Sequence, residues 1–222
     1  MTETSTVVTT QTRERYKIGT VGFAIPGSEV RIAEDGEVML KGPNIFQGYY
    51  KMQDESWGTI VDGWLHTGDL GSLDEDGFLS ITGRKKDIII TAGGKNLTPA
   101  NIENDLKQSR WISQAVMHGD RRPFPVVLIT LDPEEAPALA KELGIEDADL
   151  AALSEHPKVH EHIQAILDEV NREYAQVEQV KKFTILDHDL SQETGELTPT
   201  LKVKRNVVNE KYADRFDALY SG

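Results

Sequence analysis

The sequence predicts an α+β protein in two parts, a small β-rich part over residues 1–85 and a compact α+β part over residues 86–222. Two Asp-Gly pairs, Asp35-Gly36 and Asp76-Gly77, separate short runs rich in strand-forming residues, and such pairs are the strongest short-range hairpin signal. Beyond residue 98, apolar residues recur at helical spacing between short apolar runs. With 38% apolar residues in a chain of 222, either part can bury a core.

Residues 16–85 are expected to be β throughout, as a small antiparallel sheet or open barrel. The first hairpin joins residues 29–32 to 37–40. The second joins residues 64–73 to 78–81. Each turn contains a glycine, which adopts the positive φ that tight hairpin turns require.

The second part is expected to alternate helices and strands. Thr98 and Pro99 supply an N-cap and a first-turn proline for a helix through Ile102 and Leu106. Four apolar or amphipathic segments follow: a strand at 126–129, a helix from Pro133 to Gly144, a long amphipathic helix between 157 and 179, and a strand at 183–186. A closing helix is predicted over 206–219.

The two parts meet at Thr82–Lys95, with the sequence TGRKKDIIITAGGK. Three cations precede an apolar β-branched run that favours a strand, and paired glycines follow it. Adjacent glycines let a backbone approach a ligand closely. The alternative interpretation is a solvated turn before a buried strand.

Composition excludes several classes of function. No apolar run reaches the roughly 18 residues that a transmembrane helix needs, and the N-terminal sequence has no leader pattern, so we expect no transmembrane segment. The absence of cysteine excludes disulfides and thiolate chemistry and favours a cytoplasmic location. A formal charge of −13 argues against a general nucleic-acid surface. Nothing in the sequence sets an oligomeric state.

Three stretches carry a family resemblance: Gly63–Gly71 (GWLHTGDLG), Thr82–Lys95, and Leu197–Arg205 (LTPTLKVKR). In this order they resemble the adenylate-forming, or AMP-binding, enzymes, which include acyl-CoA synthetases, luciferases and peptide-synthetase adenylation domains. The form of the third stretch most resembles the long-chain fatty acyl-CoA synthetases. The resemblance implies that residues 1–85 are the β-rich end of the large AMP-binding domain. It implies that residues 86–222 are the mobile C-terminal lid domain.

Met1-Thr2-Glu3 matches only the tail of a motif that relatives carry deep inside the large domain. The resemblance therefore implies that the chain begins within that domain. The phosphate-binding loop and the acyl pocket would then lie upstream, and residues 1–222 alone are expected to be inactive.

The resemblance also implies roles in adenylation. Asp69 would bond the ribose hydroxyls of ATP, and Arg84 would reach the ribose or the phosphates. Lys202 would be the catalytic cation that touches the α-phosphate and the substrate carboxylate. Thr2 would contact the phosphates or the adenylate, and Glu3 would bind Mg²⁺. The alternatives are a turn aspartate at position 69 and a plain salt bridge at Arg84.

Thioester formation would involve other residues. Lys86 matches the hinge position about which the lid rotates, and Gly93 and Gly94 would line the pantetheine tunnel of CoA. Arg121 and Arg122 are candidates for the CoA nucleotide by charge alone. The alternatives are a solvated lysine in a rigid strand at position 86 and a tight turn at the glycines.

Three further positions qualify these expectations. Leu201 stands where many relatives have glycine, which leaves the path of the Lys202 loop open. His66 and His118 are interpreted as structural, because no hydroxyl nucleophile is placed beside either one.

The expected function is that of a ligase which converts a fatty acid, ATP and CoA to acyl-CoA through an acyl-adenylate. A long-chain acid follows from the branch resemblance. One alternative is adenylation of another carboxylic acid or transfer to a carrier protein. A second alternative, from a different class, is a non-catalytic domain for nucleotide binding or protein contact.

Overall fold

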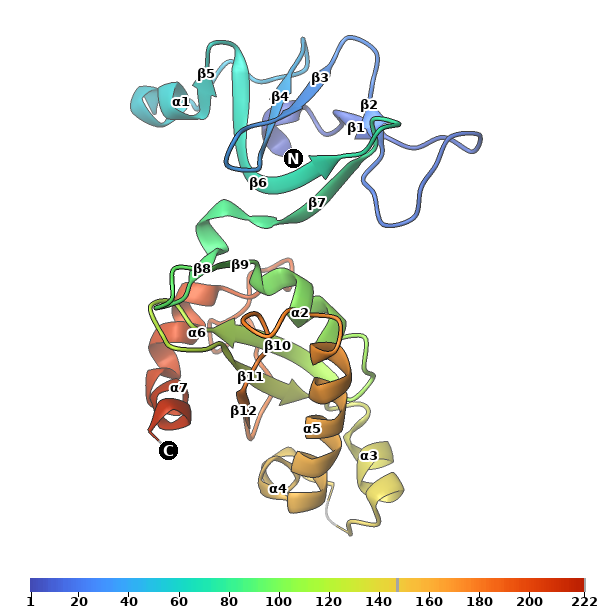
Figure 1. The fold of residues 1–222 in the computed structure, drawn as a ribbon, viewed down its shortest axis with the longest axis vertical. Coiled ribbons are helices and arrows are strands. Elements are labelled where there is room, and N and C mark those ends of the chain that lie inside the picture. The colour runs from blue at the N-terminus through green and yellow to red at the C-terminus, as the bar shows by residue number, and fades with distance from the viewer. Residues whose placement is uncertain (147, 222) are drawn as a thin grey trace. The chain divides into compact units, whose positions relative to one another are not determined.

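The computed structural model describes residues 1–146 and 148–221, and it confirms the predicted α+β class (Figure 1). The chain forms two compact units, one comprising Met1–Ile88 and the other beginning at Ile89.

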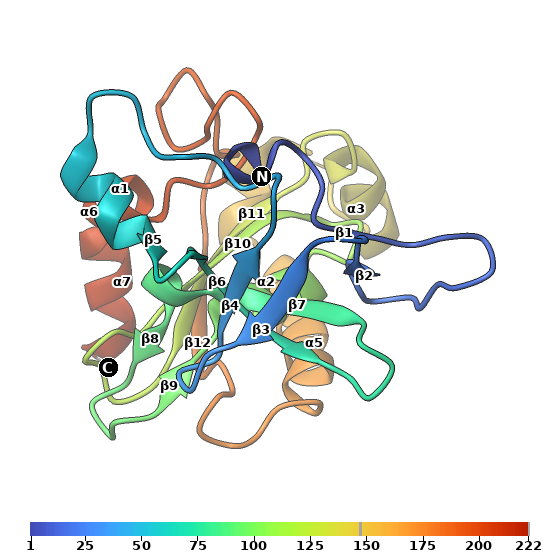
Figure 2. The same cartoon turned by 90° about the horizontal axis from the view of Figure 1, so that it is seen from above.

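The first unit is organised around a five-stranded antiparallel sheet. Its elements are η1 (Thr2–Thr4), β1 (Thr9–Thr10), β2 (Phe23–Ala24), β3 (Glu29–Ile32), β4 (Glu37–Lys41), α1 (Gln53–Thr59), β5 (Ile60–Val61), β6 (Trp64–Leu73), β7 (Leu79–Arg84) and η2 (Lys85–Asp87). β4 pairs with β3 and β6, and β6 also pairs with β5 and β7 (Figure 2). β1 and β2 form a separate pair. Five buried side chains form the core of this unit: Val8, Val38, Leu40, Leu65 and Leu79.

Both predicted hairpins are confirmed, β3–β4 and β6–β7. Gly36 and Gly77 have φ of 85° and 77°, the left-handed conformation for which glycine was expected. The expectation that residues 16–85 are β throughout is wrong at α1. This seven-residue helix buries none of its side chains, so it shows no apolar stripe in the sequence, and Asp54 and Glu55 in its first turn favour it electrostatically.

The second unit contains a three-stranded sheet covered by helices. Its elements are β8 (Ile89–Ile90), β9 (Asn96–Leu97), α2 (Pro99–Leu106), β10 (Ile112–His118), β11 (Val126–Leu131), α3 (Ala136–Leu143), α4 (Leu150–Glu155), α5 (Pro157–Asn171), β12 (Lys182–Ile185), α6 (Arg205–Lys211) and α7 (Ala213–Tyr220). The central strand β11 pairs antiparallel with β10 and parallel with β12. β8 and β9 form a separate antiparallel pair.

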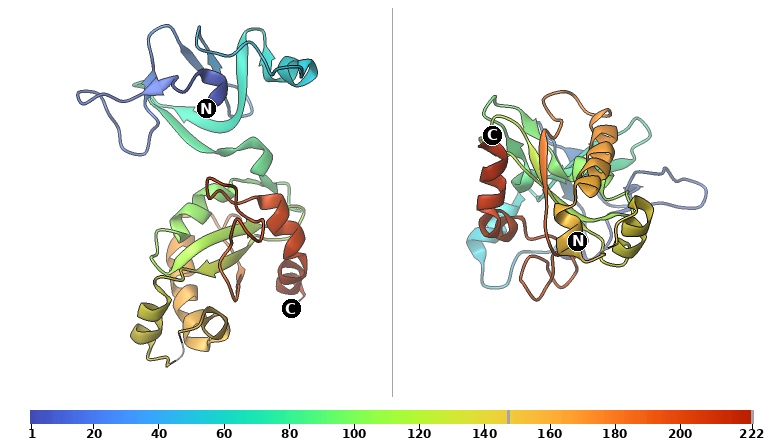
Figure 3. Two further views of the ribbon diagram at one scale, coloured as in Figure 1. Left: turned by 180° about the vertical axis from the view of Figure 1, so that it is seen from behind. Right: turned by 90° about the horizontal axis from the view of Figure 1, so that it is seen from below.

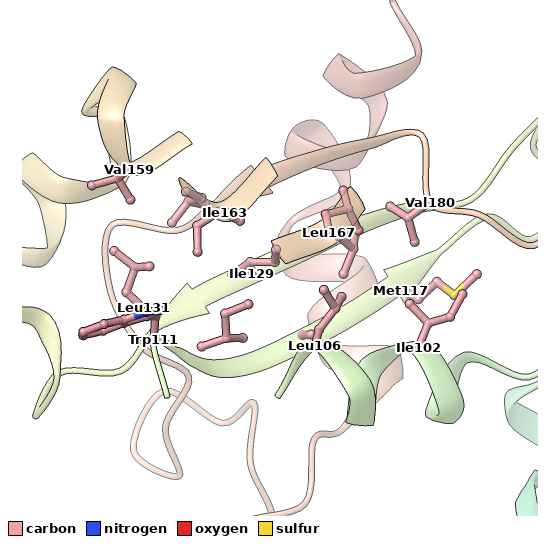
Figure 4. Close-up of a cluster of buried hydrophobic side chains, with 14 of the residues drawn as sticks. Ile102, Leu106, Trp111, Met117, Ile129, Leu131, Val159, Ile163, Leu167 and Val180 are labelled. Carbon is pink, nitrogen blue, oxygen red and sulfur yellow. The ribbon is translucent and has the colours of Figure 1, made fainter. Parts of the chain in front are cut away.

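Alternate residues of the sheet face two different cores. Met117 and Ile129 pack with residues of α2 and α5, whereas Val116 and Leu128 pack with residues of α6 and α7. Figure 4 shows the first core, in which Ile102, Leu106, Val159, Ile163 and Leu167 face the sheet. Figure 3 shows α5 (orange) and α7 (red) on opposite faces of the strands. Since successive strand residues point to opposite faces, covering both faces buries every residue of the central strand β11 and most of β10.

Helix α5 ends at Asn171, so the predicted helix to residue 179 is wrong in its last two turns. The Asn171 side chain accepts a hydrogen bond from the Val180 N–H and donates one to the Val180 carbonyl, both at 3.0 Å, which fixes a return of the chain. Tyr174 is partly buried beyond the helix, and Val177 is 52% exposed.

Other boundaries differ as well. α3 begins at Ala136 rather than Pro133, because the Asp132 carboxylate accepts the Glu134 N–H at 2.8 Å and holds a turn there; its end at Gly144 is confirmed. The closing helix divides into α6 and α7 at Tyr212. β10 and α4 were not predicted. The sequence of β10 does not alternate between apolar and polar residues, because both faces of this strand are covered. Among the described helices, none is long and apolar enough to cross a membrane.

Candidate functional site

A bulge in β6 displays Asp69. Glu37 of β4 is paired with Leu70 and Met39 with His66, so three residues of β6, Thr67 to Asp69, lie opposite a single residue of β4. Gly68 adopts φ 70° at this point. The Thr67 hydroxyl donates to the Val38 carbonyl at 2.7 Å and accepts from the Asp69 N–H at 3.0 Å. Bulges re-aim side chains and are frequent beside active sites.

Asp69 and Arg84 are brought together. They are directly paired across β6 and β7, and the Arg84 Nε lies 2.9 Å from the Asp69 Oδ1. The Asp69 side chain is about a quarter exposed and that of Arg84 about half exposed, so both remain accessible. The salt bridge that was the alternative for Arg84 is therefore present, and it leaves the second Asp69 oxygen as an acceptor.

Asp69 also lines a pocket of about 190 Å³ together with residues of the N-terminal segment, among them Met1, Thr4 and Thr6. Within the same segment, Thr2 is exposed and Glu3 is partly buried. The Glu3 carboxylate accepts a hydrogen bond from the Tyr49 hydroxyl at 3.0 Å. The pKa of Tyr49 is raised, mainly by burial and to a smaller extent by that hydrogen bond. The tyrosine therefore keeps its proton and remains a donor.

The described residues include no cluster of three or more His, Asp or Glu side chains that could hold a metal ion. Glu3 alone nevertheless fits Mg²⁺, which is bound through one or two carboxylates together with water and substrate phosphates.

Lys86 is the middle residue of the 3₁₀ turn η2, not a strand residue. The turn closes with a weak hydrogen bond from the Ile88 N–H to the Lys85 carbonyl at 3.4 Å. Short 3₁₀ turns of this kind are frequent as connectors between elements.

Lys202 lies exposed at the end of a tight loop closed by the bridge between Leu197 and Val203. The Thr198 N–H donates to the Lys202 carbonyl at 2.8 Å, and the Lys202 N–H donates to the Thr198 hydroxyl at 3.0 Å. Leu201 has φ 58°, in the left-handed region, and its side chain is 64% exposed. Leu201 thus adopts a backbone conformation that glycine usually occupies.

The base of this loop is held by Glu196, which is fully buried. Its carboxylate accepts hydrogen bonds from Lys211, from Thr194 and from the Tyr212 hydroxyl, the last at 2.9 Å. Burial alone would raise the pKa of Glu196, but these donors outweigh burial and lower the pKa to about 2. Its backbone carbonyl also accepts the Lys204 N–H at 2.7 Å.

Gly93 and Gly94 form the exposed loop between β8 and β9. Gly94 has φ 75°, and its N–H donates to the Thr91 carbonyl at 2.8 Å, so the tight turn that was the alternative is present. A Cβ added at Gly93 would meet nothing closer than 3.9 Å. The chain itself therefore does not require glycine at position 93, which leaves room for a ligand.

Arg121 and Arg122 lie beside the strand that leads into this loop. The Arg121 N–H donates to the Ile90 carbonyl at 2.8 Å, and the Ala92 N–H donates to the Arg122 carbonyl at 2.9 Å. The Arg121 side chain is 93% exposed, whereas Arg122 pairs with Asp217. Of the two arginines, Arg121 is the more exposed, and its Nε lies 3.8 Å from an Asp120 carboxylate oxygen.

His66 and His118, the two histidines expected to be structural, both have such partners. The His118 ring stacks on Phe216 with 4.5 Å between ring centroids, and burial lowers its pKa. His66 Nδ1 lies 3.1 Å from a Glu37 carboxylate oxygen. Sequence reasoning missed Glu37, Lys85 and Glu196. Glu37 stands at the start of a predicted strand, but Lys85 lies between two other cations and Glu196 lies outside the predicted strands and motifs, so the sequence carries no signal for those two.

Residues 86–222 match the family model described as the AMP-binding enzyme C-terminal domain. The chain is 45% identical over 225 residues to the long-chain-fatty-acid–CoA ligase FadD15 of Mycobacterium bovis, a match that covers 100% of this chain and 37% of that protein. It is 37% identical over 233 residues to the long-chain-fatty-acid–CoA ligase ACSBG1 of Rattus norvegicus, which covers 92% of this chain and 32% of that protein. The chain thus spans about a third of the length of these relatives.

Solved structures with a similar fold include the o-succinylbenzoate–CoA synthetase MenE of Bacillus subtilis in complex with AMP. The TM-score is 0.69 at 26% identity, over 93% of this chain and 39% of that one. The same enzyme in complex with ATP and magnesium ion gives a TM-score of 0.66 at 28% identity, over 93% of this chain and 39% of that one.

Proposed function

The chain belongs to the family of AMP-binding enzymes and carries their C-terminal domain, and from this premise we propose that it is the C-terminal part of a long-chain fatty acid–CoA ligase. We call that whole protein the complete ligase. It would join a fatty acid to CoA through an acyl-adenylate, converting ATP to AMP and pyrophosphate. The observation that supports this proposal most is the similarity to FadD15 over the entire chain.

In the first half-reaction, a fatty acid carboxylate oxygen attacks the α-phosphorus of ATP and pyrophosphate leaves. Negative charge gathers on the carboxylate and the α-phosphate, so a positioned cation stabilises the transition state. Lys202 supplies that cation. A lysine is a compact charge on a flexible stem, and its exposed place on this loop suits a residue that enters and leaves a site.

Asp69 and Arg84 bind the ribose of ATP in this proposal. One Asp69 oxygen is held by the Arg84 guanidinium at 2.9 Å, which orients the carboxylate so that it accepts from the ribose hydroxyls. Thr2 would contact the phosphates or the adenylate. Glu3 would hold Mg²⁺, whose charge when bound offsets that of the phosphates.

In the second half-reaction, the CoA sulfur attacks the acyl carbonyl carbon and AMP leaves. The loop of Gly93 and Gly94 would line the path of the thin pantetheine chain. Arg121 lies next to the same loop and would meet a phosphate of CoA. Lys86 would be the hinge between the two half-reactions, with residues 86–222 as the mobile lid.

The test is a product assay of the complete ligase with a long-chain fatty acid, ATP, Mg²⁺ and CoA. We expect acyl-CoA, AMP and pyrophosphate in equal amounts, and a lower rate for Asp69→Ala. AMP binding by isothermal titration without any acyl-CoA would instead favour a non-catalytic nucleotide-binding domain.

A second candidate is a ligase for another carboxylic acid, because MenE, named for o-succinylbenzoate, has a similar fold. Competition between a long-chain fatty acid and shorter or aromatic acids in the same assay decides between the two.

A further inference from the structure

Glu37 is a buried carboxylate that contacts the residues on either side of the Asp69–Arg84 pair. It is 4% exposed. Its Oε1 accepts the N–H of Gly68, which precedes Asp69, at 2.8 Å. Its Oε2 accepts from the Nζ of Lys85, which follows Arg84, at 3.0 Å.

Two more groups complete this cluster. His66 Nδ1 lies 3.1 Å from Glu37 Oε2, and Lys85 Nζ lies 2.6 Å from the exposed Asp35 carboxylate. Burial alone would raise the pKa of Glu37, but hydrogen bonds from Lys85, Gly68 and His66 hold the pKa below its usual value. The carboxylate is therefore ionised at neutral pH, and ionised acceptors form the stronger hydrogen bonds.

The position of Glu37 explains how the bulge keeps one shape. A bulge leaves ladder N–H groups without strand partners, and a buried N–H without an acceptor is unfavourable. The Glu37 carboxylate accepts the Gly68 N–H, and through Lys85 it is linked to the strand that carries Arg84. One side chain thus connects both strands behind the Asp69–Arg84 pair.

We propose that Glu37 is a positioning residue for nucleotide binding, which holds the Thr67–Asp69 bulge and, through Lys85 of η2, the end of β7 at Arg84, so that Asp69 faces the ribose. This inference rests on the proposed function, because it takes Asp69 as the ribose acceptor. Glu37 acts through Gly68 and Lys85 and does not touch the substrate.

The test compares ATP with 2′,3′-dideoxy-ATP, which lacks both ribose hydroxyls, in the adenylation half-reaction of the complete ligase. We expect the wild type to prefer ATP in kcat/KM by at least about tenfold, since the lost hydrogen bonds involve a charged acceptor. Glu37→Gln should remove most of this preference. It should also raise the KM for ATP more than it lowers kcat.

Asp74→Asn is the matched control. The Asp74 carboxylate also accepts two backbone N–H groups, those of Asp76 at 3.0 Å and Phe78 at 2.8 Å, and it pairs with Lys17 at 2.5 Å. It lies at the turn between β6 and β7, away from the bulge. A general loss of stability would therefore affect both variants, whereas only Glu37→Gln should lose the preference for ATP.

Hydrogen exchange in this chain gives a readout that is independent of activity. Glu37→Gln should speed exchange of the Gly68 N–H and leave that of Phe78 unchanged. If Glu37→Gln does not fold, Glu37→Asp keeps the charge on a side chain one methylene shorter and should show the same changes more weakly. A Glu37 variant that keeps the ATP preference overturns this inference alone. A wild type without the preference overturns it together with the role of Asp69.

Discussion

At the scale of single residues, substitution of Lys202 should affect the two half-reactions most differently. In the complete ligase, Lys202→Ala should slow adenylation by roughly 10²–10³, because loss of one preorganised donor costs about 2.7–4 kcal/mol in the transition state. The reaction of supplied acyl-adenylate with CoA should keep its rate, since the lysine acts in the first step only. Rapid-quench measurement of each step checks this, and equal damage to both would assign Lys202 a different role.

The left-handed backbone at Leu201 predicts that a glycine at this position would stabilise the protein. A non-glycine residue in the left-handed region costs about 1–2 kcal/mol, part of which glycine returns as extra freedom in the unfolded chain. We therefore expect Leu201→Gly to raise the free energy of unfolding by about 0.5–1 kcal/mol. Urea unfolding of the wild type and of Leu201→Gly measures this difference in the free energy of unfolding. Glu193→Gly, at an exposed residue outside the positive-φ set, is the control and should destabilise; a loss for both variants would contradict the prediction.

Glu196 predicts an acid-dependent loss of stability. Its pKa falls from 4.5 to about 2 on folding, so its contribution is complete above pH 4.5 and is lost as the pH falls toward 2. Glu196→Gln should be less stable than the wild type at pH 6, and this difference should shrink between pH 4.5 and 3. Urea midpoints at these pH values provide the measurement. The exposed neighbour Glu193→Gln should follow the wild type, and a constant difference for Glu196→Gln would rule out this role.

The residues of the candidate site were predictable only where a motif exposes them. Asp69 and Lys202 stand out because each lies in a stretch that carries the family resemblance. Glu37 and Glu196 look like solvent-facing charges, since the sequence does not reveal that a bulge or a loop base will bury them beside a lysine. Long-range partners of this kind depend on the fold.

At the scale of elements, the 3₁₀ turn η2 allows a direct test of the hinge. Lys86 is the second residue of the turn, so a proline there keeps the helical φ and removes no hydrogen bond of the turn. Lys86→Pro should hold one arrangement and block rotation. We expect one half-reaction of the complete ligase, thioester formation, to fall far more than adenylation.

The control for the hinge is Lys86→Ala, which removes the charge but leaves φ free, and it should keep both rates. Proline disfavours the helical region at the preceding Lys85, so the melting temperature is measured in parallel. A lower melting temperature with both half-reactions reduced together would show a structural lysine instead.

Among the elements, those defined by local chemistry were predictable. The hairpins follow from Asp-Gly turns, and the end of α3 follows from Gly144, which has φ 63°. The end of α5 was not predictable, because apolar residues continue at helical spacing beyond Asn171. The helix ends where the Asn171 side chain bonds the backbone of Val180. β10 was missed because a strand covered on both faces lacks alternation.

At the scale of the whole molecule, the two units should unfold separately. The first has one small core, whereas the second has two larger ones, so the first should unfold at lower urea concentration. Trp111 is buried in the second unit, and Trp57 and Trp64 lie in the first. A variant with Trp57→Phe and Trp64→Phe should therefore report a later fluorescence transition than Trp111→Phe. Coincident transitions in the two variants would show one cooperative fold.

The fully buried strand β11 has a consequence for synthesis on the ribosome. Its sequence, VVLITL, is uncharged and strongly β-forming, a composition that favours intermolecular strand pairing when exposed. Its parallel neighbour β12 begins more than fifty residues later, since Val126 pairs with Lys182. At about 5–20 residues per second, this edge stays open for several seconds in every nascent chain. The order of segments therefore places the greatest aggregation hazard before the helices α6 and α7, which cover one face of β11, have been made.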